Sequence, residues 1–384
     1  MASGLDRHSP KRGPQSRDAG VPSADHDDRT RDDKAYGKPQ DRSALGRFWA
    51  LVRALQRGSD PAVVMVTLAL LIVVAVLVSL NLGFIKIPPV DVLKTFFGQG
   101  TSQQELVLFQ FRLPRIVLAL LVGGSLALSG AILQSVSQNG LADPGILGIN
   151  AGAGLAVVGL LIVGTGSSAF LLPAVAFLGA AATAALIYAL AYKDGSVTPS
   201  RLLLVGIAIN AGIAATILVL SMRMDRQLYS YAVAWLSGTI AGTSWDYVFA
   251  LLPWTLLLVP LTFAKARTLD VLSLGDMLAT GLGAAVERQR LILLGVAVAL
   301  AGSAVAVGGG IGFVGLVGPH LARRLVGPNH RVMLPTTALA GALLLVVADS
   351  LARNLFAPVE MPVGVVVAAI GAPYFLYLLA KTRG

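Results

Sequence analysis

The sequence predicts an all-α, polytopic membrane protein, and three observations carry that prediction. Hydrophobic residues make up 55% of the 384-residue chain and charged residues only 13%, about half the charge fraction usual in soluble domains. The mean hydropathy is +0.75. After residue 60, apolar runs of about 20 residues, the length that crosses a bilayer, follow one another almost without interruption. Water is therefore not the main solvent of this chain.

The N-terminal stretch differs from the rest of the chain. Residues 1–60 contain 12 Lys or Arg and 9 Asp, which predicts a disordered cytoplasmic leader. No short apolar core with a small-residue cleavage site is present, so the first span is expected to stay uncleaved. Arginines mixed with apolar residues over 45–57 fit an interfacial helix lying on the membrane, and an extended linker fits nearly as well. Residues 61–384 are predicted to form one transmembrane domain.

Hydropathy places about ten transmembrane helices in that domain. The expected spans are 61–82, 113–135, 143–164, 170–192, 201–222, 245–264, 289–308, a shorter 311–325, 334–353 and 362–381. If the N-terminus is cytoplasmic, the inner loops hold eleven Lys or Arg and the outer loops seven, so the positive-inside rule places both termini in the cytoplasm. Because the basic residues form no stripe with aromatics, nucleic acid is a poor explanation of the net charge of +10.

Many of the 42 glycines lie inside spans, where small residues let helix backbones approach closely. Tight packing is the simplest reading for most of them. The run VGGGIGFVGLVG, residues 307–318, is denser in glycine and predicts a broken helix or tight turn inside the bundle. Such backbone is tolerated only where protein or a water-filled cavity covers it.

Few charged residues fall inside spans. Asp349 and Arg353 are one helical turn apart and are expected to pair. A structural or partner-facing role for Asp349 is favoured over a proton relay, and Glu360 is expected to stabilise the start of the last span. The chain has no cysteine and no phosphate loop of the Walker type. No catalytic constellation, cofactor site or metal site is predicted, so the chain is not expected to be an enzyme.

The loop over residues 266–290 is too polar to span the membrane, yet its apolar residues recur at helical spacing. It predicts two short helices broken at Gly275 and Gly281, with Asp270, Asp276 and Glu287 facing water. The residues expected to line the apolar side are Leu269, Leu272, Leu274, Met277, Leu278 and Leu282. A docking hairpin and an amphipathic connector resting on the membrane both fit, and periodicity alone favours neither.

Several stretches together resemble the FecCD-type permease subunits of binding-protein-dependent ABC importers for ferric siderophores, haem and cobalamin. The matching stretches are RLPR (112–115), LALSGAILQ, NGLADPGILGINAGA (139–153), LSLGDMLATGLG (272–283), GFVGLVGPHLARRLVGPNHR (312–331) and MPVGVVVAAIGAPYFLYLL (361–379). They occur in order over most of residues 61–384. The ordered series is specific, although each stretch alone is weak.

The resemblance implies a cobalamin-permease-like bundle in the cell membrane, paired with a second permease as a homodimer or heterodimer. Two cytoplasmic ATP-binding cassette ATPases and an extracytoplasmic substrate-binding protein complete the importer; lipid surrounds it. By similarity, the loop at about 266–290 contains the coupling helix that fits a cleft of the ATPase. The matching positions are Thr268, Leu272, Leu274, Gly275, Asp276, Met277, Gly281 and Gly283.

The resemblance also suggests roles at the two ends of the bundle. Arg112, Arg115 and Arg353 match outward-facing arginines that engage acidic residues of the binding protein, and simple snorkelling to lipid headgroups is the alternative. Asn139 and Leu141 match positions that narrow the inner exit, in the stretch NGLADPG (139–145), which we call the elbow. A helix cap at Asn139 or Asp143 explains these residues equally well.

The leading functional prediction is a permease subunit of an ABC importer, with ferric siderophore as the substrate. Haem and cobalamin are the alternatives within the family. An ion-coupled secondary carrier is the alternative from another class, because composition alone fits either kind of carrier.

Overall fold

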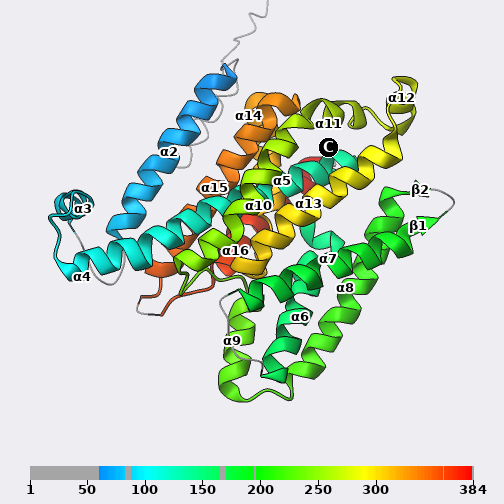
Figure 1. Cartoon of the computed structure of the whole chain (residues 1–384). Coiled ribbons are helices and arrows are strands. Elements are labelled where there is room, and N and C mark those ends of the chain that lie inside the picture. Colours follow the sequence, from blue (N-terminus) through cyan, green and yellow to red (C-terminus); the bar gives the residue numbers. More distant parts are fainter. Residues whose placement is uncertain (1–59, 83–87, 165–169, 194–195, 358, 383–384) are drawn as a thin grey trace, which may run out of the picture. The chain divides into compact units, whose positions relative to one another are not determined.

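The computed structural model describes residues 60–82, 88–164, 170–193, 196–357 and 359–382, all within one compact unit, Phe48–Gly384. The leader and the interfacial helix expected over 45–57 lie outside the described residues. The regular elements of the described residues are helices, apart from two short antiparallel strands, β1 (Tyr192–Lys193) and β2 (Ser196–Val197), in which Tyr192 lies opposite Val197. The all-α prediction is confirmed (Figure 1).

Every expected span coincides with a helix. The helices are α2 (Pro61–Asn81), α3 (Pro89–Phe96), α4 (Ser102–Glu105), the π-helix η1 (Leu106–Arg112), α5 (Leu113–Val136), the 3-10 helix η2 (Pro144–Leu147), α6 (Ile149–Val163), α7 (Leu171–Ala191), α8 (Pro199–Ser221), α9 (Arg226–Leu236), α10 (Trp245–Ala264), α11 (Ala266–Leu272), α12 (Asp276–Gly281), α13 (Val286–Gly308), α14 (Val314–Val326), α15 (His330–Asn354) and α16 (Val363–Thr382). Among the described residues, seven helices are long and apolar enough to cross a membrane, and α6 and part of α16 form shorter apolar helices.

The largest differences from the hydropathy prediction are two helix starts. The second span begins at Ser102, because α4, η1 and α5 form one continuous helix, Ser102–Val136. A capping box between Thr101 and Gln104 starts it. Pro114 has no N–H to donate, and the turn that precedes it widens into the π-helix. The third span begins at Ile149, because the Asp143 side chain caps the 3-10 turn η2 instead.

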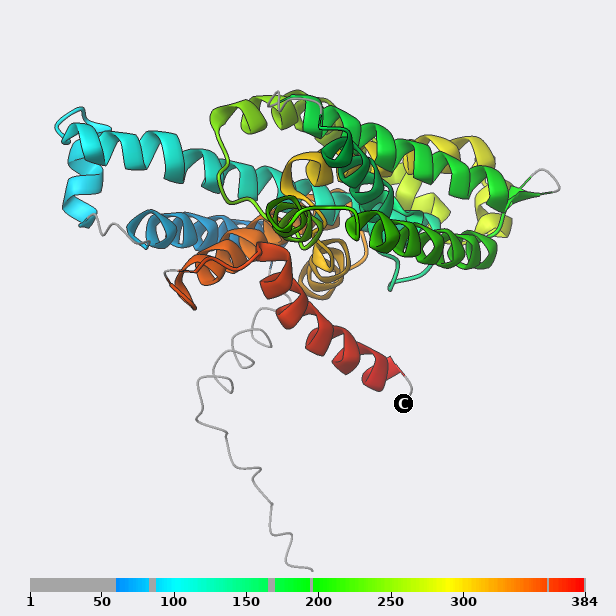
Figure 2. The ribbon, with the colours of Figure 1, turned by 90° about the horizontal axis from the view of Figure 1, so that it is seen from below.

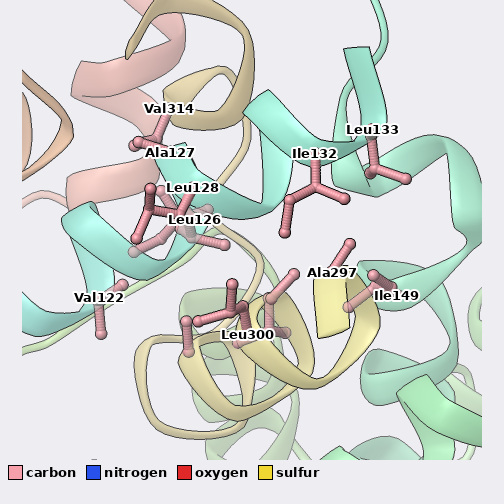
Figure 3. Close-up of a cluster of buried hydrophobic side chains, with 14 of the residues drawn as sticks. Val122, Leu126, Ala127, Leu128, Ile132, Leu133, Ile149, Ala297, Leu300 and Val314 are labelled. Atoms are coloured by element: carbon pink, nitrogen blue, oxygen red, sulfur yellow. The ribbon is translucent and has the colours of Figure 1, made fainter. Parts of the chain in front are cut away.

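Helix α5 lies at the centre of the bundle and packs against α13, α14 and α15 (Figures 1 and 2). Figure 3 shows Leu126, Leu128 and Ile132 of α5 beside Ala297 and Leu300 of α13, all of them buried. The outer helices α2, α8 and α10 are mostly exposed and apolar. Such faces suit lipid or a second bundle, because neither offers hydrogen bonds to a polar side chain.

Glycine pairs set the closest helix approaches. A Cβ added at Gly123 of α5 would overlap the Gly341 carbonyl of α15, and one added at Gly130 would overlap the Gly315 carbonyl of α14. The two backbones approach closely only because neither glycine carries a side chain. The packing reading of these glycines is confirmed.

The glycine-rich run 307–318 breaks the helix, as predicted. Helix α13 ends at Gly308 and α14 begins at Val314, with Gly309 and Phe313 in left-handed conformations between them. The Gly310 N–H donates to the Trp235 carbonyl of α9 at 3.2 Å. Protein therefore covers the irregular backbone, which is the condition for placing it inside a membrane domain.

Candidate functional site: the two ends of helix α5

Two groups of polar side chains lie at opposite ends of α5, about 30 Å apart along the helix axis. We call the first the arginine end, formed around Arg112, Arg115 and Arg353. We call the second the hairpin end, formed by the elbow and by the hairpin α11–α12. Each end is built from residues far apart in the sequence.

The two helices of the hairpin have different surroundings. In α11, Leu269 and Leu272 are buried, and the helix packs against α5 and α15. In and around α12, Met277 is 89% exposed, and Leu274, Leu278 and Leu282 are exposed as well. The sequence analysis expected one apolar side shared by both helices, and this prediction is wrong. The leucines of α11 point into the bundle, whereas the large apolar side chains in and around α12 are exposed.

The acids of the hairpin region stay partly exposed, as the sequence predicted, and each of them also binds a buried partner. Asp276 accepts hydrogen bonds from buried Arg290 of α13 at 2.7 and 2.9 Å, and Glu287 accepts another from Arg290 at 2.6 Å. Asp270 faces His330 at the start of α15. Neither Arg290 nor His330 was singled out from the sequence, because Asp276 and Asp270 reach them from other helices.

In the elbow, Asp143 caps the 3-10 helix η2, as the sequence allowed, whereas Asn139 closes a turn at which no helix begins. The Asn139 side chain accepts from the Leu141 N–H at 3.0 Å, and the Asp143 side chain accepts from the Gly145 N–H at 2.8 Å. Burial raises the pKa of the Asp143 carboxyl, and the hydrogen bond from Gly145 opposes that rise. Asn139 and Leu141 are half-buried. A role for this pair as an inner gate stays a prediction.

At the arginine end, three buried side chains and the exposed Glu360 form an ion-pair cluster. Arg115 of α5 binds Asp349 of α15 through Nε at 2.9 Å and Glu360 through a terminal nitrogen at 2.8 Å. Arg353 lies 3.2 Å from the other Asp349 oxygen, so the expected Asp349–Arg353 pair is confirmed. Glu360 was expected to stabilise the start of α16; instead it pairs with Arg115.

All three arginines of the arginine end are buried within this chain. Arg112 donates to the Leu80 carbonyl, and Arg353 donates to the Ser79 hydroxyl, both at the end of α2. Their guanidinium groups therefore meet protein in this chain rather than headgroups or solvent. Their role in docking a binding protein stays a prediction.

These features together define a class, the multi-pass helical membrane permeases. A central helix carries one polar cluster at each end, a helix with exposed apolar residues lies at one end, and apolar faces surround the bundle. The chain belongs to the FecCD transport family, whose model matches residues 70–381. The resemblance inferred from the ordered stretches is therefore confirmed.

Known proteins of this kind are similar over nearly their whole length. The iron(3+)-hydroxamate import system permease protein FhuG of Bacillus subtilis is 54% identical over 85% of this chain and 98% of its own length. The iron-uptake system permease protein FeuC of the same organism is 41% identical over 82% and 96%. A solved structure described as an inward-facing conformation of a metal-chelate type ABC transporter has a TM-score of 0.74 and 32% identity, over 84% of this chain and all of that one.

Membership of this family establishes the coarse function. The chain is a transport permease subunit of an ABC importer, and ATP hydrolysis belongs to a separate subunit. The family implies partners of three kinds: an ATPase, a substrate-binding protein and a second permease. An ion-coupled secondary carrier does not fit this family.

Proposed function

We propose that this chain forms part of the translocation path of an importer for ferric siderophores, and that hydroxamate chelates are its first substrate class. The observation that carries the proposal is the 54% identity to FhuG over 98% of that protein. Haem and cobalamin are the alternatives that the same family allows.

The hairpin is the proposed docking element for the ATPase. Large apolar side chains are exposed on α12 at Met277 and Leu278 and directly after it at Leu282, and patches of this kind on a soluble-facing helix mark interaction sites. The residues assigned to coupling are Thr268, Leu272, Leu274, Gly275, Asp276, Met277, Gly281 and Gly283. Leu272 is buried among them, so its role is to hold α11 on the bundle while α12 contacts the partner.

The hairpin end is accordingly proposed to face the cytoplasm, together with both chain termini. The excess of Lys and Arg in the loops on that side supports this orientation.

The elbow then lies at the inner exit, where Asn139 and Leu141 narrow the path that this chain forms with a second permease. An alanine at both positions is expected to increase leak of substrate without ATP, which an ordinary helix cap would not do.

The arginine end is proposed to face the extracytoplasmic binding protein. Arg112, Arg115 and Arg353 are buried in this chain. Docking through them therefore requires a carboxylate of the binding protein to reach side chains that are shielded from solvent. Charge reversal at Arg353 is expected to weaken docking in a salt-dependent way. Charge reversal at the exposed Lys94, which pairs only loosely with Asp91 at 3.9 Å, is the matched control. Equal losses in both variants would contradict a specific role for the arginines.

The proposal is tested by uptake into proteoliposomes. The complex of this chain with its ATPase, a second permease and a binding protein is expected to accumulate a radioactive ferric hydroxamate chelate when ATP is supplied. An ATPase unable to hydrolyse ATP should abolish uptake, and an uncoupler should leave it unchanged. Accumulation by this chain without the ATPase would overturn the permease assignment. Uptake of haem or cobalamin in preference to the chelate would overturn the substrate class alone.

A further inference from the structure

Three polar side chains from three helices form a hydrogen-bonded chain at the hairpin end. The Ser135 hydroxyl of α5 lies 2.7 Å from Nε2 of His330, the first residue of α15. On the other side of the ring, Nδ1 of His330 lies 2.6 Å from Oδ1 of Asp270 in α11. Ser135 is 4% exposed and His330 is 3% exposed. The sequence separates Ser135 from His330 by 195 positions.

The residue types match a nucleophilic triad, but the surroundings do not. A nucleophilic serine must be reachable by its substrate, whereas Ser135 is buried and also bonds the Ala131 carbonyl of its own helix at 2.8 Å. The geometry therefore fits a structural link between helices rather than acyl transfer.

Proton counting shows that the chain of hydrogen bonds has two arrangements. A serine hydroxyl carries one proton. When the ring is neutral and Nδ1 carries its proton, Ser135 donates to His330 Nε2; Ser135 donates to the Ala131 carbonyl only when Nε2 is protonated and itself donates to the Ser135 oxygen. Asp270 accepts from His330 Nδ1, and the same carboxylate oxygen accepts the His330 backbone N–H at 3.0 Å. The carboxylate of the hairpin thus holds both the ring and the first turn of α15.

The three residues connect the hairpin to the inner end of α5. Asp270 belongs to the hairpin, and Ser135 is the last residue but one of α5, directly before the elbow. The other tie of the hairpin, Asp276 to Arg290, leads to α13. Among the described residues, a hydrogen bond from Gln138 to Asp276 connects α12 to the end of α5, and it is long, at 3.5 Å; at that length a hydrogen bond is weak.

We propose that Asp270, His330 and Ser135 are positioning residues that transmit movement of the hairpin to the inner end of α5. This inference rests on the proposed docking of the ATPase to the hairpin. A variant that lacks one of these hydrogen bonds still lets the ATPase bind and hydrolyse ATP. The hairpin is then held less firmly in position relative to the elbow. The expected consequence is futile hydrolysis, with less substrate moved for each ATP.

The test measures substrate transported per ATP hydrolysed in the reconstituted complex of full chains. Ser135→Ala and Asp270→Asn are expected to lower that ratio about three- to tenfold, the equivalent of one hydrogen bond, while ATPase binding stays at the wild-type level. Ser137→Ala is the matched control, because Ser137 makes the same bond to its own helix, to the Leu133 carbonyl at 2.6 Å. Its ratio should stay at the wild-type value.

A double variant distinguishes a chain from two separate contacts. If the three residues form one link, adding Asp270→Asn to Ser135→Ala costs little beyond either single change. Fully additive losses, or wild-type ratios in both single variants, would overturn the inference. Ser135→Ala removes one oxygen only and carries the test if Asp270→Asn fails to fold. A wild-type complex that did not transport with ATP would instead contradict the proposed function.

Discussion

At the arginine end, the carboxylate of Asp349 faces two arginines at once. Its carboxylate is 1% exposed and lies within 3.2 Å of both Arg115 and Arg353. Taking charges out of water is costly, and the cost is repaid only when each charge keeps its partners. Removing this one side chain would leave Arg353 without its acidic partner and Arg115 with Glu360 alone.

Asp349→Ala is therefore expected to destabilise the protein by about 3–5 kcal/mol, the range for breaking a buried pair. The measurement is the midpoint of unfolding by sodium dodecyl sulfate in detergent micelles. Asp91→Ala removes the acid of an exposed pair with Lys94 and should change stability by less than about 1 kcal/mol. Similar shifts for the two variants would show that burial does not decide the strength of these pairs.

The sequence predicted only the local part of this cluster. The Asp349–Arg353 pair follows from a spacing of four residues on one helix. Arg115 lies 234 residues before Asp349 and 245 residues before Glu360, and no local pattern brings it to these acids. The Ser135–His330–Asp270 link was missed for the same reason, since its three residues belong to three helices.

At the scale of elements, close backbone contacts hold α5 against its neighbours. The sequence predicted that glycines pack helices, yet it did not identify which glycines face each other. That information depends on the rotation of each helix about its axis, which hydropathy leaves undefined when a helix is apolar all round. Gly130 of α5 is such a position, because its Cα faces the Gly315 backbone.

Gly130→Ala is expected to force α5 and α14 apart and to cost about 1–3 kcal/mol, as overpacking does. Gly212→Ala in α8 is the matched control, because an added Cβ there meets no atom within 4 Å. In an open helix interior alanine is favoured over glycine by about 0.5–1 kcal/mol. The unfolding midpoint in detergent is thus expected to fall for Gly130→Ala and to rise for Gly212→Ala, each relative to the wild type. A destabilised Gly212→Ala variant would contradict the packing argument.

Helix positions were predicted well where apolar length determines the ends of the helix. They were predicted poorly where a capping residue determines the start. The bundle spans follow from apolar length, whereas the early start at Ser102 depends on the capping box of Thr101 and Gln104. The hairpin was predicted as two short helices, and the structure divides its leucines between two environments. Periodicity cannot supply that division, because it does not say which partner covers each face.

At the scale of the molecule, α5 and α15 are joined at both ends. Arg115 meets Asp349 at the arginine end, Ser135 meets His330 at the hairpin end, and Gly123 and Gly341 approach each other between them. Two helices held at three levels move as one body more readily than they separate. Under the proposed link, a displacement of the hairpin is expected to be carried along this pair of helices toward the arginine end.

The orientation of this pair in the membrane can be tested directly because the chain contains no cysteine. A single introduced thiol is then the only target of a membrane-impermeant maleimide. Met277 beside the hairpin end is 89% exposed and Phe97 after α3 is 80% exposed. If the hairpin end faces the cytoplasm, Met277→Cys is labelled only in inside-out vesicles and Phe97→Cys only in right-side-out vesicles. Leu126→Cys, buried in the core, should react in neither preparation. Labelling of Met277→Cys from the outside would reverse the orientation and would remove the hairpin from the reach of a cytoplasmic ATPase.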